Sequence, residues 1–176
     1  TQAELAYAPG NIEGFNFGLK PSESTQYEVG LKAQLSDTRI NAAVFQITTE
    51  DELVVDQSIG GRTSYQNAGR TLRRGFEVGI ESQLSEQWST NIAYTRLQAT
   101  YDSNQQHAAP GYSVFNWRAR FEQKVEHWTF HQTLRLDNLL DRQYVGSVIV
   151  GDGNGRYYEA APGRSWYAGA GAEYQF

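Results

Sequence analysis

The stretch of sequence that decides the fold is Trp166-Tyr167-Ala168-Gly169-Ala170-Gly171-Ala172-Glu173-Tyr174-Gln175-Phe176. Apolar side chains occupy every second position of it: Trp166, Ala168, Ala170, Ala172, Tyr174 and Phe176. Successive side chains of a β-strand point to opposite faces of the sheet. The period of two therefore predicts a strand with one apolar face and one face made mostly of glycine and polar residues.

The same alternation recurs upstream and predicts six further strands. It is clearest in three segments, at positions 27–35, 76–84 and 128–136. Three other segments follow it less cleanly, at positions 39–55, 88–101 and 112–121. Most of the predicted strands have about ten residues or more, and a tilted strand of about 9–11 residues crosses a lipid bilayer.

The connections between these strands are predicted to alternate in length. Short turns are expected at positions 36–38, 85–87 and 122–126, and longer links at positions 57–64, 102–111 and 137–164. If the last strand runs towards the periplasm, every short turn lies at the periplasmic end and every longer link at the outer surface. Outer-membrane barrels have this asymmetry.

The bulk composition allows a membrane barrel and argues against some other classes. The mean hydropathy of −0.60 is that of a soluble protein, but alternating membrane strands average to such values. The net charge of −5 argues against a general nucleic-acid binder, which would carry a basic patch. The chain has no cysteine, so it forms neither a disulfide nor a thiolate metal site. It opens with Thr1-Gln2-Ala3-Glu4 and no signal-peptide pattern, so we expect a processed product or an excised piece.

Aromatic residues near the predicted strand ends favour a membrane barrel over a soluble β-sandwich. Alternation alone does not separate the two folds, because both have strands with one polar face. Membrane barrels place girdles of aromatic residues at the two membrane interfaces. The residues concerned are Tyr27, Trp88, Tyr94, Tyr101, Trp128, Trp166, Tyr174 and Phe176.

The C-terminal stretch also resembles the sorting signal of outer-membrane proteins, which ends in an aromatic residue after alternating apolar positions. The predicted assembly signal consists of Trp166, Ala168, Ala170, Ala172, Tyr174 and Phe176. Its strand would be an unpaired edge, and the barrel-assembly machinery could pair with that edge before the barrel closes.

Several short motifs, taken in their order and spacing, resemble the C-terminal barrel of a TonB-dependent outer-membrane receptor. They are LKPSES at 19–24, YEVGLK at 27–32, INAAVF at 40–45, NAG at 67–69, RGFE at 74–77, DNLLDRQY at 137–144 and PGR at 162–164. The resemblance covers nearly the whole chain, from about Leu19 to Phe176.

This resemblance implies an all-β fold, an antiparallel up-and-down transmembrane β-barrel segment. About seven strands would belong to a larger barrel of about 22 strands. Residues 1–24 would form an extracellular loop-like segment, and residues 25–176 the C-terminal strands of the barrel. An odd number of strands does not close a bacterial up-and-down barrel, so we expect the missing strands in a parent protein or in another copy of the chain.

The resemblance also implies a location and partners. Such receptors lie in the bacterial outer membrane and take up scarce nutrients, most often ferric siderophores, with energy passed on by TonB. The implied partners are the lipid bilayer, the barrel-assembly machinery, a small-molecule substrate, an upstream plug domain and TonB. The sequence contains neither the plug nor a TonB box, so we expect the isolated chain to be unable to transport by itself.

The outer loops carry the residue types best suited to holding an organic metal chelate. Aromatic rings stack on such a ligand, and arginine pairs with its oxygens. The candidate ligand-binding residues are Tyr101, His107, Tyr112, Arg156, Tyr157 and Tyr158.

The sequence predicts neither an enzyme nor a resident metal or cofactor. His127 and His131 lie roughly 13 Å apart along one strand, which is too far for both to ligate one metal ion. The run GDGNGR at 151–156 lacks the later ligands of a calcium loop. No serine sits in a nucleophile-elbow pattern.

Two other functions remain open from the sequence. A small self-contained outer-membrane barrel, acting as an anchor or adhesin, would need an eighth strand within residues 1–20. There Leu5 and Tyr7 give only a faint pattern before Pro9-Gly10. A soluble β-barrel that binds a small ligand would instead bury its apolar face in the interior. Whether that face is covered separates the soluble barrel from the two membrane proteins.

Overall fold

The computed structural model describes residues 5, 7–8, 12–101, 110–148 and 158–176. Regular structure in these ranges is β-strand, and no helix there is long and apolar enough to cross a membrane. The long strands are β3 (Glu23–Leu35), β4 (Thr38–Glu50), β7 (Thr71–Gln83), β8 (Trp88–Tyr101), β9 (Tyr112–Val125), β10 (Trp128–Asp137) and β13 (Ser165–Tyr174). The short strands are β1 (Tyr7–Ala8), β2 (Ile12–Glu13), β5 (Glu52–Ile59), β6 (Arg62–Ala68), β11 (Val145–Val148) and β12 (Tyr158–Ala160).

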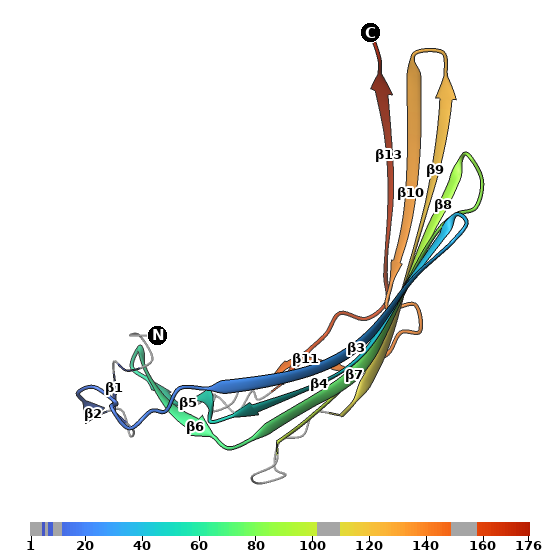
Figure 1. Ribbon diagram of the computed structural model, residues 1–176. Coiled ribbons are helices and arrows are strands. Elements are labelled where there is room, and N and C mark those ends of the chain that lie inside the picture. The colour runs from blue at the N-terminus through green and yellow to red at the C-terminus, as the bar shows by residue number, and fades with distance from the viewer. Residues whose placement is uncertain (1–4, 6, 9–11, 102–109, 149–157) are drawn as a thin grey trace.

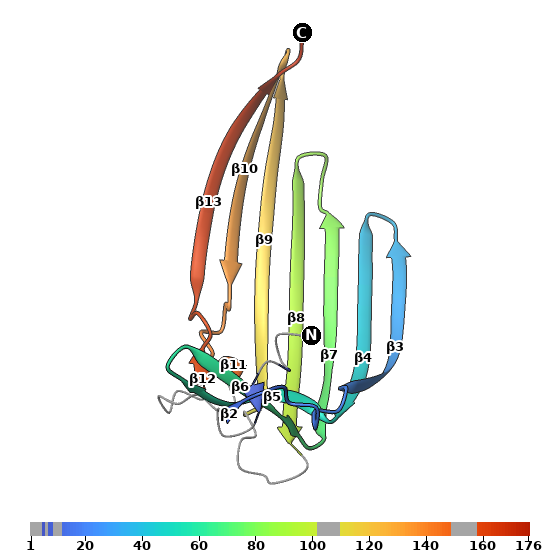
Figure 2. The same ribbon diagram turned by 90° about the vertical axis from the view of Figure 1, so that its left-hand side faces the viewer.

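The long strands form one antiparallel, seven-stranded sheet in the order β13-β10-β9-β8-β7-β4-β3. Consecutive long strands are neighbours throughout, which confirms the predicted up-and-down arrangement. Figure 2 shows β13 and β3 at the two opposite edges of the sheet. Figure 1 shows the strong twist and curvature that the strands share.

Short turns join the long strands at one end of the sheet. Ser36-Asp37 connects β3 to β4, and Glu126-His127 connects β9 to β10. Ser36 and Glu126 have φ values of 51° and 54°. Tight hairpin turns need such left-handed residues, because only they match the twist of the flanking strands. The turn predicted at 122–126 is placed too early, since β9 continues to Val125.

The pairing register sorts the side chains onto two faces. One row of directly opposite residues crosses all the long strands and is apolar: Ala33, Ile40, Ile80, Ile92, Trp117, Leu136 and Trp166. The adjacent row is mostly polar or charged: Gln34, Arg39, Glu81, Asn91, Arg118, Arg135 and Tyr167. Directly opposite residues share a face, so the sheet has one apolar face and one polar face.

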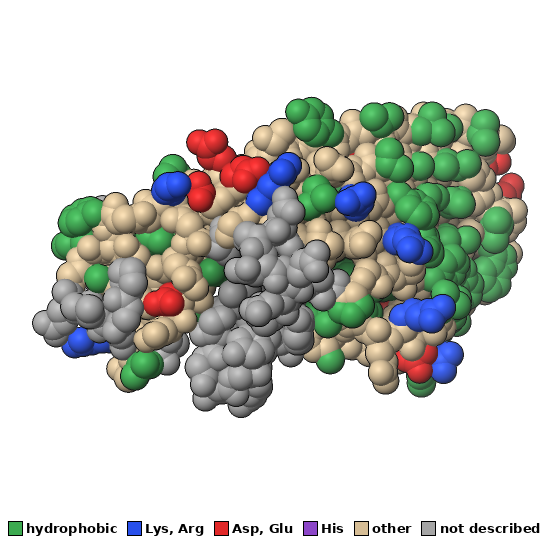
Figure 3. Space-filling model, turned by 90° about the horizontal axis from the view of Figure 1, so that it is seen from below, with side chains coloured by type: hydrophobic (Ala, Val, Ile, Leu, Met, Phe, Trp, Pro, Cys, Tyr) green, Lys and Arg blue, Asp and Glu red, His purple; other side chains and the backbone are tan. Residues whose placement is uncertain are grey.

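No second layer covers the apolar face in the part of the chain that the structure describes. Val29 is 73% exposed and Trp166 is 69% exposed, whereas Val54 and Val114 are the buried hydrophobic residues. Figure 3 shows hydrophobic side chains gathered over one side of the molecule. A continuous exposed apolar surface of this kind is typical of contact with a membrane or another molecule.

The segment predicted as one strand at 39–55 is two strands. β4 ends at Glu50, the chain turns at Asp51 with a φ of 50°, and β5 begins at Glu52. β5 pairs with β6, and Gly60-Gly61 makes the turn between them with φ values of 59° and 79°. The longer link predicted at 57–64 is therefore wrong. Glycine adopts two successive positive φ values at little cost, and these close a tight hairpin.

The N-terminal segment lies against the β5–β6 hairpin. The side-chain amide of Asn16 donates a hydrogen bond to the carbonyl oxygen of Tyr65 at 2.9 Å. Asn67 binds the backbone of Lys20 twice, accepting from its N–H and donating to its carbonyl oxygen, each at 2.9 Å. β3 begins at Glu23, slightly before the predicted boundary at residue 25. The extracellular location of residues 1–24 stays a prediction.

Candidate functional site

The structure describes only part of the predicted ligand site. Three of its residues lie outside the described ranges: His107, Arg156 and Tyr157. Two others are placed only as strand residues, since Tyr101 ends β8 and Tyr158 begins β12. Tyr112, the first residue of β9, has a described side chain.

Tyr112 stacks on Tyr144, with ring centroids 4.3 Å apart and ring planes at 27°. Tyr144 directly precedes β11, and both tyrosines are half-buried. Tyr112, Asn116 and Arg118 are separated by even numbers of residues along β9, so their side chains share one face. Tyr112 therefore belongs to the polar face of the sheet. A stacked tyrosine pair at the loop end of this face presents a rigid aromatic surface with two hydroxyl groups.

Asn138 holds the loop that carries Tyr144. The side chain of Asn138 accepts a hydrogen bond from the N–H of Arg142 at 2.9 Å and donates to the carbonyl oxygen of the same residue at 2.9 Å. It also donates to the carbonyl oxygen of Pro162 at 3.3 Å. Asn138 is 3% exposed, and a buried amide that meets its partners in this way fixes the surrounding backbone.

Asp141 connects the same loop to the start of the last strand. Its carboxylate oxygen Oδ1 accepts the backbone N–H of Arg164 at 2.8 Å. Asn138 and Asp141 both have positive φ values, of 49° and 50°. The DNLLDRQY and PGR motifs of the sequence therefore meet in space, and together they set the position of Tyr144.

A second aromatic contact lies on the polar face between β10 and β13. The guanidinium carbon of Arg135 lies 5.6 Å from the ring centroid of Tyr167, its directly opposite residue. Arg135 also forms an ion pair with Asp137 at 2.8 Å. Both Arg135 and Tyr167 are exposed, so a ligand could reach the cation and the ring together.

We call Tyr112, Tyr144, Arg135 and Tyr167 the aromatic–arginine wall, which consists of two separate pairs. Arg135 is opposite Arg118, six residues along β9 from Tyr112, so the pairs lie roughly 20 Å apart along the polar face. Tyr112, Arg135 and Tyr167 share the polar face, and Tyr144 stacks on Tyr112. The sequence prediction found only Tyr112. Arg135 and Tyr167 could have been found, because both stand at polar-face positions of their strands. Tyr144 carries no such signal, since it lies in a loop.

The predicted assembly signal lies on β13 and just beyond it. β13 pairs with β10 along one side and is the edge strand of the sheet. Tyr174 contacts Trp128 and Phe176, with centroid distances of 5.1 Å and 5.2 Å. An aromatic cluster therefore marks this end of the apolar face, and recognition by assembly machinery stays a prediction.

His127, in the turn before β10, and His131, on β10, make separate contacts. His127 packs against Tyr174, with centroids 5.8 Å apart, and the His131 ring lies over Gly171. The described residues contain no group of three or more His, Asp or Glu side chains that could hold a metal ion. The absence of a resident metal stays a prediction for the whole chain.

These features define the class of protein as the wall of a membrane β-barrel: up-and-down strands, an uncovered apolar face, a polar face, and short turns that join neighbouring long strands directly at one end of the sheet. The family model described as TonB dependent receptor-like, beta-barrel matches residues 1–176. The chain belongs to this family, whose barrels lie in the bacterial outer membrane.

Curated relatives match over parts of the chain. The catecholate siderophore receptor Fiu of Escherichia coli K12 is 26% identical over 136 residues, which is 76% of this chain and 17% of the relative. The probable TonB-dependent siderophore receptor PiuA of Acinetobacter baumannii is 28% identical over 96 residues, covering 53% of this chain and 12% of the relative. The chain therefore spans less than a fifth of the length of these relatives.

Solved structures share the fold. The FrpB iron transporter of Neisseria meningitidis superposes with a TM-score of 0.59 at 16% identity, over 90% of this chain and 25% of that protein. The copper transporter OprC superposes with a TM-score of 0.50 at 15% identity, over 90% of this chain and 32% of that protein. Identities this low support the shared sheet architecture and nothing finer.

Proposed function

We propose that this chain forms the C-terminal wall of a larger outer-membrane receptor that actively takes up a scarce nutrient. The observation that carries the proposal is the pair of adjacent rows, apolar and polar, that run across all seven long strands. One face suits lipid and the other a water-filled lumen. The open edges β3 and β13 would pair with further strands, and a barrel of about 22 strands fits this requirement.

The proposed substrate is a ferric siderophore or a similar metal chelate. Support comes from the two relatives, a catecholate siderophore receptor and a probable siderophore receptor. The aromatic–arginine wall adds support, because stacked tyrosine rings and an exposed guanidinium suit a flat, anionic organic ligand.

The partners follow from this function. In the intact receptor an upstream plug would fill the lumen, and TonB would supply energy through it. The bilayer would meet the apolar face, and the barrel-assembly machinery would engage the β13 edge. The protein would act as a transporter rather than as an enzyme, and it would need no resident cofactor. The uncovered apolar face does not favour the soluble ligand-binding barrel.

The test uses the intact protein and a double variant, Arg135→Ala with Tyr144→Ala. We expect the dissociation constant for a ferric catecholate chelate to rise about tenfold or more, since two contacts worth about 1.4 kcal/mol together are lost. Fluorescence titration gives this constant, and uptake of radioactive iron by cells gives the transport rate. Tyr27→Ala is the matched control, because Tyr27 lies on the apolar face and is 70% exposed.

Two results would count against different parts of the proposal. If the wild-type protein binds and transports no metal chelate, the receptor function is wrong. If the wild type does both and the double variant binds equally well, the receptor stands but the aromatic–arginine wall is not its ligand site.

A further inference from the structure

Two arginines on the apolar face have no part in the proposed uptake site. Arg74 of β7 and Arg96 of β8 are both exposed, and neither side chain has an ion-pair or hydrogen-bond partner among the described residues. The neighbouring Arg73 points to the other face and pairs with Glu52 at 2.6 Å. Unpaired cations on a mostly apolar face need an explanation, because placing charge in lipid is costly.

The register brings these arginines together with two glutamines. Arg74 lies directly opposite Gln46 on β4 and Gln98 on β8, and Arg96 lies opposite Phe76. Arg74 and Arg96 are therefore diagonal neighbours, whose Cα atoms are expected about 7–8 Å apart. We call Gln46, Arg74, Arg96 and Gln98 the arginine–glutamine patch.

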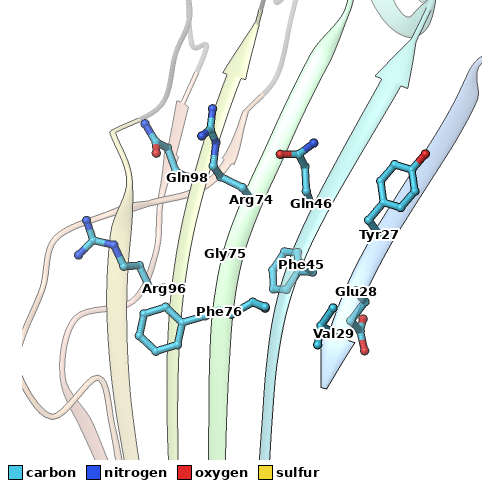
Figure 4. A pocket seen from close by; sticks show the side chains of 11 residues that line it. Tyr27, Glu28, Val29, Phe45, Gln46, Arg74, Gly75, Phe76, Arg96 and Gln98 are labelled. Carbon is cyan, nitrogen blue, oxygen red and sulfur yellow. The ribbon is translucent and has the colours of Figure 1, made fainter. Parts of the chain in front are cut away.

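The polar ends of the patch all point one way. Figure 4 shows the ends of Gln46, Arg74, Arg96 and Gln98 directed towards the outer ends of β4 and β8, as is the hydroxyl of Tyr27. Long polar side chains at a membrane boundary take this course, because the stem stays on the apolar surface while the head reaches the polar layer.

The patch lines part of a cleft whose other lining residues are mostly apolar and include one acid, Glu28. The cleft has a volume of ≈ 630 Å³, and its lining includes the patch together with Val29, Val44 and Phe76. Phe76 packs against Tyr94, with ring centroids 5.3 Å apart. Side chains of this kind offer a surface on which lipid acyl chains pack.

The height of the patch matches the outer membrane boundary. From Trp88, at the short-turn end of β8, to Arg96 the strand rises roughly 26 Å at about 3.3 Å per residue. At a tilt of about 35–45° this rise spans roughly 20 Å across the membrane, against an apolar band about 25 Å tall. Arg96 therefore lies slightly inside the outer boundary of the band, and Arg74, opposite Gln98 two residues further along β8, lies close to that boundary. From there their long side chains reach the phosphate groups of outer-leaflet lipids.

We propose that the arginine–glutamine patch binds the phosphate groups of a phosphorylated lipid of the outer leaflet, with acyl chains of that lipid in the adjacent cleft. Each guanidinium donates paired hydrogen bonds to phosphate oxygens, and the two glutamine amides add further donors. Glu50, an acid further out on the same face, is paired with Arg70 at 3.1 Å and leaves the patch positive. The proposal rests on the membrane placement and is independent of which cargo the receptor carries.

The experiment measures lipid binding to the intact protein in a neutral detergent by native mass spectrometry. The probes are purified lipid A with both phosphates, the same lipid after phosphate removal, and inorganic phosphate alone. The variant is Arg74→Ala with Arg96→Ala, and the matched control is Arg118→Ala. Arg118 is likewise exposed, and its side chain has no ion-pair or hydrogen-bond partner among the described residues, but it lies on the polar face. Heat-shifted migration on a gel verifies that each variant is folded.

We expect the double variant to bind phosphorylated lipid A about tenfold more weakly than the wild type, and Arg118→Ala to bind it equally well. Removal of the phosphates should weaken binding to the wild type to the same extent. The proposal is overturned if the folded double variant binds as the wild type does, or if phosphate removal has no effect. It is also overturned if inorganic phosphate alone binds as tightly, because the site would then recognise a free ion. Unchanged iron uptake in the double variant would leave the proposed transport function intact.

Discussion

The long-stranded sheet and the outer junction, where β4 and β7 continue into β5 and β6, are held together in different ways. In the sheet, backbone pairing is continuous, as from Glu23↔Glu50 to Leu35↔Thr38 between β3 and β4, and most side chains remain exposed. At the outer junction the side chains are buried and polar. Thr49 is 4% exposed and Thr71 is 2% exposed.

Hydrogen bonds between side chains dominate the outer junction. Arg73 binds Glu52 at 2.6 Å and lies within 3.4 Å of both Thr49 and Thr71 hydroxyl oxygens. The amide of Asn67 donates to the carbonyl oxygen of Asp51 at 2.8 Å. The membrane sheet therefore relies on its backbone ladder, since every backbone group in lipid needs a partner. The bent outer hairpin adds specific side-chain contacts to its own backbone pairing.

The largest change in the free energy of unfolding is expected from a substitution at Gly75, where neighbouring strands of the backbone ladder pack closely. A Cβ atom at Gly75 would overlap the carbonyl oxygen of Arg96 and lie 2.8 Å from Cζ of Phe45. Gly75→Ala should therefore lower the free energy of unfolding by about 2–3 kcal/mol, as overpacked sites do. Urea unfolding of the intact protein in lipid vesicles, followed by tryptophan fluorescence, measures this change.

Gly79→Ala is the matched control for that measurement. Gly79 lies on the same strand and face, and nothing lies within 4 Å of the position its Cβ would take. We expect a change of no more than about 0.5 kcal/mol. Equal destabilisation by the two substitutions would contradict the close approach of Phe45 and Arg96 to Gly75.

A smaller effect is expected from Arg73→Ala at the outer junction. The variant leaves Glu52 without its cation, and Oε2 of Glu52 already lacks a partner among the described residues. We expect a loss of about 2 kcal/mol, confined to the hairpin. Hydrogen exchange should therefore speed up in a peptide covering 52–68 but not in one covering 88–100. Uniform exchange in both peptides would show that the junction and the sheet unfold as one unit.

The smallest effect is expected from Arg39→Ala within the sheet. Arg39 pairs with Glu81 at 3.6 Å, but the two side chains are 62% and 55% exposed. Exposed ion pairs contribute little, so the free energy of unfolding should change by less than about 0.5 kcal/mol. A loss as large as that of Arg73→Ala would mean that side chains hold the sheet as they hold the junction.

Much of the sheet was predictable from local pattern. The predicted strands at 88–101 and 128–136 agree closely with β8 and β10, although the alternation is less clean at 88–101 and Gln132 interrupts the apolar positions of 128–136. The prediction of a single strand at 39–55 was wrong because the chain turns at Asp51. Hydrophobic periodicity does not indicate which residue adopts a positive φ value. The sequence analysis predicted a longer link where Gly60-Gly61 makes a tight turn, although two adjacent glycines are a known signal for a hairpin turn.

The candidate site was less predictable than the sheet. Tyr112 was expected from its residue type and its place at a loop, but its stacking partner Tyr144 was not. Their contact depends on the fold of residues 137–144, where Asn138 closes the loop with three side-chain hydrogen bonds. No spacing in the sequence indicates which loop residue will reach the first residue of β9.

The sequence by itself determined that this chain forms two-faced strands joined up and down, because the alternation of side chains is a local property of an extended backbone. Only the tertiary structure decided which residues share a row across the sheet. Register aligned Arg135 with Tyr167 and brought Arg74 beside Arg96, and the bend at Asp51 buried a polar junction. These contacts join residues far apart in the chain, so they depend on how neighbouring strands align rather than on any one strand.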